Sequence, residues 1–275
     1  MRWYADNSEL HGIRGADIPD ILLFGGVAVP AHAERGLHQA LEGIKKKHGA
    51  ARAPVKWNFK NLGPEYKKQN QEKLFETLLA SSGEWRSQMF EEAAKHDIQV
   101  IVSVIETLSV KKDKIKDAKA TLSGFAFANG LMRYGLCVAD AKPEHAQVML
   151  DWPDKHDSEP FTLEYQHAYA RGRSSGGQEY YCGALQSIGF LDSVAYTTMV
   201  NSTLLQFADL VVGATREVVN CALGKGKEGL GVNLSKSIKH RYYGAPTEIF
   251  GRGINVASRN ERLKAQLRDY LKATF

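Results

Sequence analysis

Cysteine is scarce in this chain, and the patterns in which it usually has a structural role are missing. The 275 residues contain three widely spaced cysteines, with no C-x-x-C and no Cys/His metal pattern. This excludes a disulfide framework and a zinc ribbon. The amino-terminal segment lacks the apolar core of a signal peptide, and no hydrophobic run approaches the length of a membrane span. We therefore expect a cytoplasmic protein with free thiols and no membrane partner.

The best-known signatures of hydrolases and nucleotide-binding proteins are absent as well. The nine histidines form no H-E-x-x-H or Ser-His-Asp arrangement, and no Walker-type loop is present. Gly25-Gly26 lies inside an expected strand rather than between a strand and a helix. Close backbone packing or a bulge is therefore favoured over a phosphate cradle.

The composition is that of an ordinary globular protein, with 43% hydrophobic and 24% charged residues. The net charge is +5, and basic residues gather in four groups: residues 45–48, 111–119, 171–173 and 236–241. Such clusters fit a polyanionic partner such as DNA or RNA, although solvated helix faces produce the same runs.

Hydrophobic periodicity predicts an α/β protein without an internal repeat. The expected strands are residues 2–6, 21–29, 98–105 and 147–151, with a fifth within 188–196. The expected helices are residues 33–47, 65–96 (broken near 81–83), 113–139, 158–170, 202–217 and 262–271. Residues 222–258 are rich in glycine and basic side chains and show little periodicity.

The helix expected over residues 202–217 (STLLQFADLVVGATRE) is apolar almost all round, as in a buried helix. A narrow polar line runs along it, made of Gln206, Asp209, Gly213 and Arg216. Asp209 lies two turns inside, too deep to be an N-cap. A buried carboxylate must be paired, protonated or bound to a metal.

Two further aspartates, Asp6 and Asp151, end expected strands, and ligands collect at strand ends in α/β sheets. If those strands are neighbours and the helix crosses them, three carboxylates converge with Asp209. Oxygen ligands of this kind suit Mg²⁺ or Mn²⁺. Such metals activate water for phosphodiester hydrolysis. Turn capping by Asp6 and Asp151 is the alternative.

This order of elements, with aspartates on the first strand, the fourth strand and the last helix, resembles the ribonuclease H-like fold. That fold implies a mixed five-stranded sheet flanked by helices, here with a helical insertion after strand 2. More closely, residues 1–220 resemble the bacterial family called domain of unknown function 3800. The matching stretches are residues 4–8 (YADNS), 24–29 (FGGVAV), 55–57 (VKW), 149–151 (MLD) and, most specifically, 205–213 (LQFADLVVG).

The resemblance implies one ribonuclease H-like domain over residues 1–220, with the helical insertion at 31–96. A basic C-terminal extension with a terminal helix follows at 221–275. Asn7 stands where the family has a glutamate, and the fourth acidic ligand of ribonuclease H has no clear match. The candidates for it are Glu106, Asp154 and Glu217.

The expected function is that of a metal-dependent nuclease in which Asp6, Asp151 and Asp209 bind the metal and Lys56 contacts the scissile phosphate. A surface lysine is the alternative for Lys56. Candidates for substrate binding are Asn7, Ser8, Gln206, Arg171 and Arg173. Gln206 is equally consistent with a structural hydrogen bond. The alternative function is a weakened or inactive module of the same fold that binds nucleic acid or a protein partner. The insertion at 31–96 could form a lid or a homodimer contact.

Overall fold

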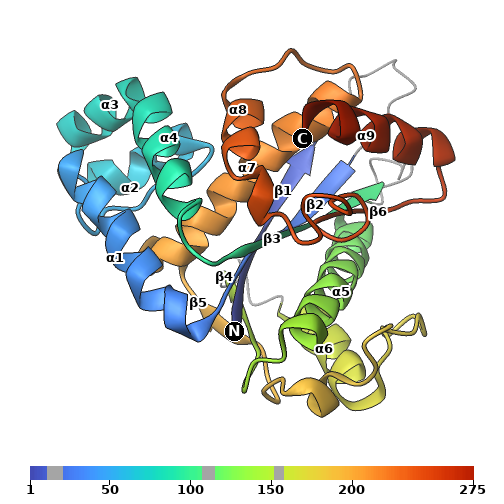
Figure 1. Ribbon diagram of the computed structural model, residues 1–275. Coiled ribbons are helices and arrows are strands. Elements are labelled where there is room, and N and C mark those ends of the chain that lie inside the picture. Colours follow the sequence, from blue (N-terminus) through green and yellow to red (C-terminus); the bar gives the residue numbers. More distant parts are fainter. Residues whose placement is uncertain (11–20, 107–114, 152–157) are drawn as a thin grey trace.

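A single six-stranded sheet forms the centre of the computed structural model, which describes residues 1–10, 21–106, 115–151 and 158–275 (Figure 1). The strand order is β5-β4-β1-β2-β3-β6. β1 and β3 run antiparallel to β2, whereas β4 and β5 run parallel to β1, and β6 runs parallel to β3. The strands are β1 (Arg2–Leu10), β2 (Ile21–Val29), β3 (Gln99–Glu106), β4 (Gln147–Asp151), β5 (Ala195–Thr197) and β6 (Ile254–Ala257).

The expected α/β class and the pairing of the first and fourth strands are confirmed. The number of strands was underestimated, because the sixth strand is a run of only four residues, Ile254–Ala257, in a glycine-rich stretch. The first strand also continues to Leu10, so Asp6 lies inside it rather than at its end. The parallel pairing with β4 nevertheless stops at Ala5 and Leu150, just before Asp6.

Helices cover both faces of the sheet, and each face has its own hydrophobic core. On one face lie α5 (Ile115–Ala141) and α6 (Glu159–Arg171), which pack against each other (Figure 1). On the other face α7 (Thr203–Ala222) crosses β1 and β2, and α8 (Leu230–Ser237) and α9 (Glu261–Thr274) join the same core. Alternation along β1 sorts the side chains, since Trp3 and Ala5 belong to the first core and Tyr4 to the second.

The segment between β2 and β3 is helical, as expected. It contains α1 (Ala31–Lys47), a 3₁₀ turn η1 (Phe59–Leu62), α2 (Gly63–Lys68), α3 (Glu72–Ala80) and α4 (Ser82–Ala93). Pro30 ends β2 because it has no N–H for the ladder, and α1 begins directly after it. These helices form a lobe beside α7 (Figure 1). The loop between α1 and η1 carries Lys56 and Trp57.

Close backbone packing explains the glycines in and beside the sheet. A Cβ on Gly25 would lie 2.2 Å from the carbonyl oxygen of Ile101, so only glycine fits between β2 and β3 there. A Cβ on Gly26 would lie 2.9 Å from Cβ of Ala208, so this glycine lets α7 approach the sheet. Gly213 of α7 allows a different close approach, because a Cβ there would lie 2.1 Å from Cγ of Trp57.

The last quarter of the chain is more ordered than its sequence indicated. Residues 222–258 contain α8 and β6, and apolar side chains of this region and of α9 extend the core beneath α7. The side chain of Asn260 accepts a hydrogen bond from the backbone N–H of Leu263 and caps α9. All three cysteines are free, as expected. In the part of the chain that is described, no helix has the length and apolarity to span a bilayer.

Candidate functional site

Asp6 and Asp151 lie side by side on neighbouring parallel strands. The register pairs Tyr4 with Met149 and Ala5 with Leu150, so Asp6 and Asp151 follow as the next pair. By the alternation along β1, Asp6 points to the face that α7 covers. Asp151 Oδ1 accepts a hydrogen bond of 2.6 Å from the backbone N–H of Met199, at the start of the 3₁₀ turn η5 (Met199–Asn201). Asp151 thus does cap a turn, although a different one from the turn directly after it.

Asp209 is brought to the same place by α7. Ser202 caps this helix by accepting a hydrogen bond from the N–H of Leu205, and its apolar side chains bury it against the sheet. Asp209 Oδ2 accepts a hydrogen bond of 2.5 Å from the backbone N–H of Trp57. Its carboxyl group also forms a hydrogen bond with that of Asp6. The strand and the helix therefore meet through two acidic side chains.

Burial and mutual repulsion change the protonation of this pair. Desolvation, followed by the negative charge of Asp209, raises the pKa of Asp6 from its ordinary 3.8 to about 8. The negative charge of Asp151 adds to this shift, while the N–H of Asn7, 2.7 Å from Asp6 Oδ1, opposes it. Burial also raises the pKa of Asp209, against the N–H of Trp57 and the hydrogen bond from Asp6. The pair as a whole therefore keeps a proton to a higher pH than an isolated aspartate would.

Lys56 is the cation of this site. Its ammonium group lowers the pKa of both Asp6 and Asp209, so it lies within electrostatic reach of the two carboxyl groups. The side chain is partly buried, whereas nearby Lys60 is exposed. This partial burial distinguishes Lys56 from Lys60, and its contact with a scissile phosphate stays a prediction.

The side chains gathered here offer oxygen donors, which suit Mg²⁺ or Mn²⁺. The Asp6–Asp209 pair fits a cation, because a cation would relieve the repulsion that now holds a proton on Asp6. Within residues 1–10, 21–106, 115–151 and 158–275, however, no three His, Cys, Asp or Glu side chains are already arranged around a common ion position. Asp6 and Asp209 form the closest acidic pair, and the charge of Asp151 acts on Asp6 more weakly than that of Asp209.

Gln206 is 1% exposed, and its amide group is engaged within the protein. Its Oε1 accepts hydrogen bonds from Nζ of Lys45 (3.0 Å) and the N–H of Val55 (3.3 Å). Its Nε2 donates to the carbonyl oxygens of Met199 (3.0 Å) and Val200 (3.1 Å). These contacts match the structural alternative, and they join the segment before Lys56 to the turn that Asp151 caps.

Of the remaining predicted binding residues, Asn7 adjoins Asp6, whereas the two arginines lie away from the aspartates. Asn7 is exposed, and its backbone serves Asp6. Ser8 pairs with Leu23 in the sheet, and its side chain is outside the described residues. Arg171 and Arg173 are exposed at the end of α6, which packs on α5 across the sheet from α7.

Two candidates for a fourth acidic ligand have other partners. Glu106 accepts hydrogen bonds from Oγ of Ser258 and Nδ2 of Asn260, next to β6. Oε2 of Glu217 accepts from the N–H of Gly231 at 2.8 Å. The third candidate, Asp154, is outside the described residues.

Sequence reasoning missed Arg86, which contacts the loop that carries Lys56. It lies on α4 within SGEWRSQMFEEA, and a lone arginine in a helix gives no sign of a site. Its Nη2 donates to the carbonyl oxygens of Lys56 (3.2 Å) and Trp57 (2.5 Å). Only the tertiary structure brings α4 to this loop.

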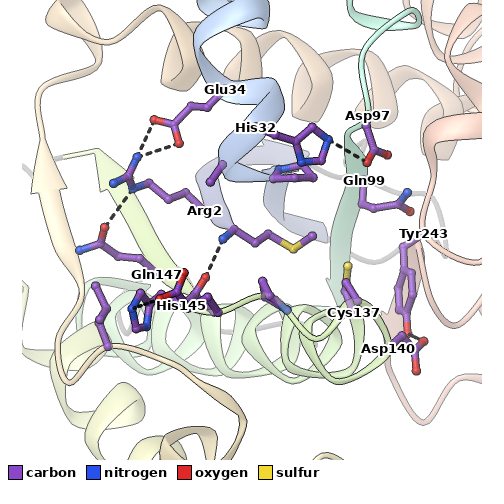
Figure 2. Close-up of a pocket in the computed structure, with 18 residues that line it drawn as sticks. Arg2, His32, Glu34, Asp97, Gln99, Cys137, Asp140, His145, Gln147 and Tyr243 are labelled. Carbon is purple, nitrogen blue, oxygen red and sulfur yellow. Dashed lines mark hydrogen bonds and ion pairs between the residues drawn. The ribbon is translucent and has the colours of Figure 1, made fainter.

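A cavity of about 830 Å³ contains none of the aspartates of the site (Figure 2). It lies where β1 begins, between the start of α1 and the end of α5. Much of its polar lining is paired internally. Arg2 bonds to Glu34 at 2.7 Å, and His32 lies 3.5 Å from Asp97. The cavity is therefore set apart from the carboxylate site.

No known protein was found whose site could be compared with this one. Comparisons with protein-family models, with curated proteins and with solved structures found no match to this chain.

Proposed function

We propose that this protein is a metal-dependent nuclease of ribonuclease H-like fold that hydrolyses phosphodiester bonds in DNA or RNA. The observation that carries the proposal is the meeting of Asp6 and Asp209, partly buried carboxyl groups from a strand and a helix, beside Asp151 and Lys56. The order of these three carboxylates along the chain resembles that of the acidic site of that fold, although its fourth acidic ligand has no clear match here. A strand order in which β1 joins an antiparallel β2-β3 pair to parallel β4 and β5 supports the same assignment.

In this proposal Asp6 and Asp209 hold a Mg²⁺ or Mn²⁺ ion, and Asp151 supplies a third carboxylate beside them. When bound, the ion supplies Lewis-acid activation of the attacking water and stabilisation of the leaving oxygen. The chain's own contribution is positioning. The N–H of Trp57 fixes Asp209, and the N–H of Met199 fixes Asp151.

Lys56 has a separate part in the proposed reaction. Its ammonium group lies close enough to the carboxyl groups to lower the pKa of both. There it would attract a phosphate oxygen and hold the backbone against the acidic side chains. Lysine binds phosphate as a compact point charge, so the position of the loop decides its effect.

The test is cleavage of labelled single- and double-stranded DNA and RNA by the purified protein with Mn²⁺ at low salt. We expect cleavage that stops in EDTA. Asp151→Asn should lower the rate at least about a hundredfold, the scale of losing one preorganised electrostatic contact. Asp269→Asn, on the exposed side of α9, is the matched control and should leave the rate unchanged. Absence of cleavage for every substrate, or full activity of Asp151→Asn, would contradict the proposal.

Lys56→Met is compared with Lys60→Met in the same assay. We expect the first to weaken cleavage, mainly through binding of the substrate, and the second to have little effect, because Lys60 is exposed on η1. Equal rates for the two variants would remove Lys56 from the proposed site.

A second function, a weakened or inactive module of the same fold that binds nucleic acid, is favoured by the partners of Glu106 and Glu217. Both are hydrogen-bonded elsewhere and so do not strengthen a metal site at Asp6. The same assay separates the two functions. Binding of nucleic acid that is unchanged by EDTA and by Asp209→Asn, without cleavage, identifies the module.

A further inference from the structure

The loop between α1 and η1 delivers two groups to the carboxyl pair: the ammonium of Lys56 and the backbone N–H of Trp57. Residues 53–56 of this loop belong to no helix or strand, so no regular hydrogen-bond ladder fixes them. We propose that Arg86 is the positioning residue of the site, because it clamps this loop so that Trp57 N–H holds Asp209. This inference rests on the proposed function.

The clamp is formed first by hydrogen bonds. Nη2 of Arg86 donates to two consecutive carbonyl oxygens, those of Lys56 at 3.2 Å and Trp57 at 2.5 Å. Consecutive carbonyls held by one group fix the direction of the peptide between them. The N–H of Trp57 lies at that peptide, and it donates to Asp209 Oδ2 at 2.5 Å. Arg86 therefore acts on Asp209 through the peptide of Trp57, and its positive charge also lowers the pKa of Asp209 directly.

Aromatic packing fixes the same loop. The guanidinium carbon of Arg86 lies 4.9 Å from the ring centroid of Trp57 and 4.8 Å from that of Trp85. The Trp57 ring also fills the space above Gly213, where a Cβ would come within 2.1 Å of its Cγ. Gly213 follows Asp209 by one turn of α7. The ring is thus in contact with α4 and α7, and its backbone stands opposite Asp209.

Stability alone is a poor explanation for this arginine. Arg86 is only 8% exposed, its Nε has no hydrogen-bond partner, and its hydrogen bonds go to carbonyl oxygens. Desolvation lowers the pKa of Arg86 and outweighs the attraction of its charge to the carboxylates of Asp209 and Glu217. Burying a guanidinium in this way is costly, and an apolar side chain of similar size often stabilises a core as well or better. The guanidinium of Arg86 is planar, so it can stack on the two tryptophan rings while it donates to two carbonyl oxygens. The ammonium group of lysine lacks that shape.

The experiment compares Arg86→Lys with Arg133→Lys. Arg133 is a matched control, since it is also partly buried, has an Nε without a partner and donates one hydrogen bond, to Asn255. It lies on α5, across the sheet. The protein is labelled with ¹⁵N-tryptophan, and the Trp57 amide is assigned with Trp57→Phe. At one fixed pH we expect Arg86→Lys to move this resonance upfield, because the hydrogen bond to Asp209 lengthens, and Arg133→Lys to leave it in place.

Cleavage with Mn²⁺ gives the functional part of the test. We expect Arg86→Lys to lower kcat about a hundredfold with little change in KM, since small misplacements of a catalytic group act on this scale. Arg86→Gln, which keeps an N–H donor, is measured in parallel in case the lysine variant does not fold. An unmoved Trp57 resonance in a folded Arg86 variant overturns the positioning role, whatever the activity. A moved resonance in a protein that cleaves nothing retains the role of Arg86 at Asp209 and rejects the nuclease.

Discussion

The pH dependence of folding is a direct test of the carboxyl pair, and it needs no substrate. The folded protein raises the pKa of Asp6 from 3.8 to about 8 through burial and the charge of Asp209. In the unfolded chain Asp6 keeps an ordinary pKa. Below about pH 4 both states hold the proton, so the pair costs the fold nothing. As the pH rises toward 8 the unfolded state gains stability by releasing the proton, and folding loses free energy.

The size of this loss follows from the shift. One pKa unit corresponds to about 1.4 kcal/mol, so the shift of Asp6 amounts to roughly 6 kcal/mol between about pH 4 and about pH 8. That is a large part of the free energy of unfolding of a typical domain, which is roughly 5–15 kcal/mol. Asp6→Asn has a similar shape and cannot ionise. We therefore expect the free energy of unfolding of Asp6→Asn, minus that of the wild type, to grow with pH by several kcal/mol.

The measurement is urea unfolding followed by circular dichroism in EDTA, from about pH 4 to about pH 9. Titrating groups away from the pair contribute equally to both proteins, so the difference reports the coupled pair of Asp6 and Asp209. Asp269→Asn, with an exposed carboxylate on α9, is the control and should give a difference that stays flat. Parallel curves for Asp6→Asn and the wild type would refute the reasoning. At pH 8, Mn²⁺ should stabilise the wild type and not Asp6→Asn, because a ligand stabilises the state that binds it.

Two further predictions concern the parts of the fold that place the site, both measured as the free energy of unfolding in urea. Gly25→Ala should destabilise the protein by roughly 3 kcal/mol or prevent folding, because its Cβ would meet backbone atoms of β3. Gly43→Ala, in open space on α1, should instead raise the free energy of unfolding by roughly 0.5–1 kcal/mol. Gln206→Met should cost roughly 2–4 kcal/mol, since it removes a partner from the buried ammonium of Lys45, while the exposed Gln186→Met stays within about 0.5 kcal/mol. Equal effects within either pair would contradict the packing described here.

Local patterns predicted the elements whose burial is simple. β2 was expected at residues 21–29 and is found there, since its nine residues are buried throughout. The break in the helical insertion near Ser81 was also expected, and α4 follows that residue. β6 escaped prediction because four residues of a parallel edge strand carry no periodicity, and only pairing with β3 makes them a strand. For α7 the apolar pattern indicated burial correctly, but it did not show what Gly213 would contact.

The sequence by itself determined the acidic groups and their order: aspartates on two strands and one inside a buried helix. It could do so because a carboxylate in an apolar periodic segment stands out without knowledge of its neighbours. The tertiary structure alone decided the groups that surround Asp209. Trp57 N–H and Arg86 come from a loop and from a helix far from α7 in the chain. Their contacts depend on how the helical lobe packs against α7, and no local pattern of side chains records that packing.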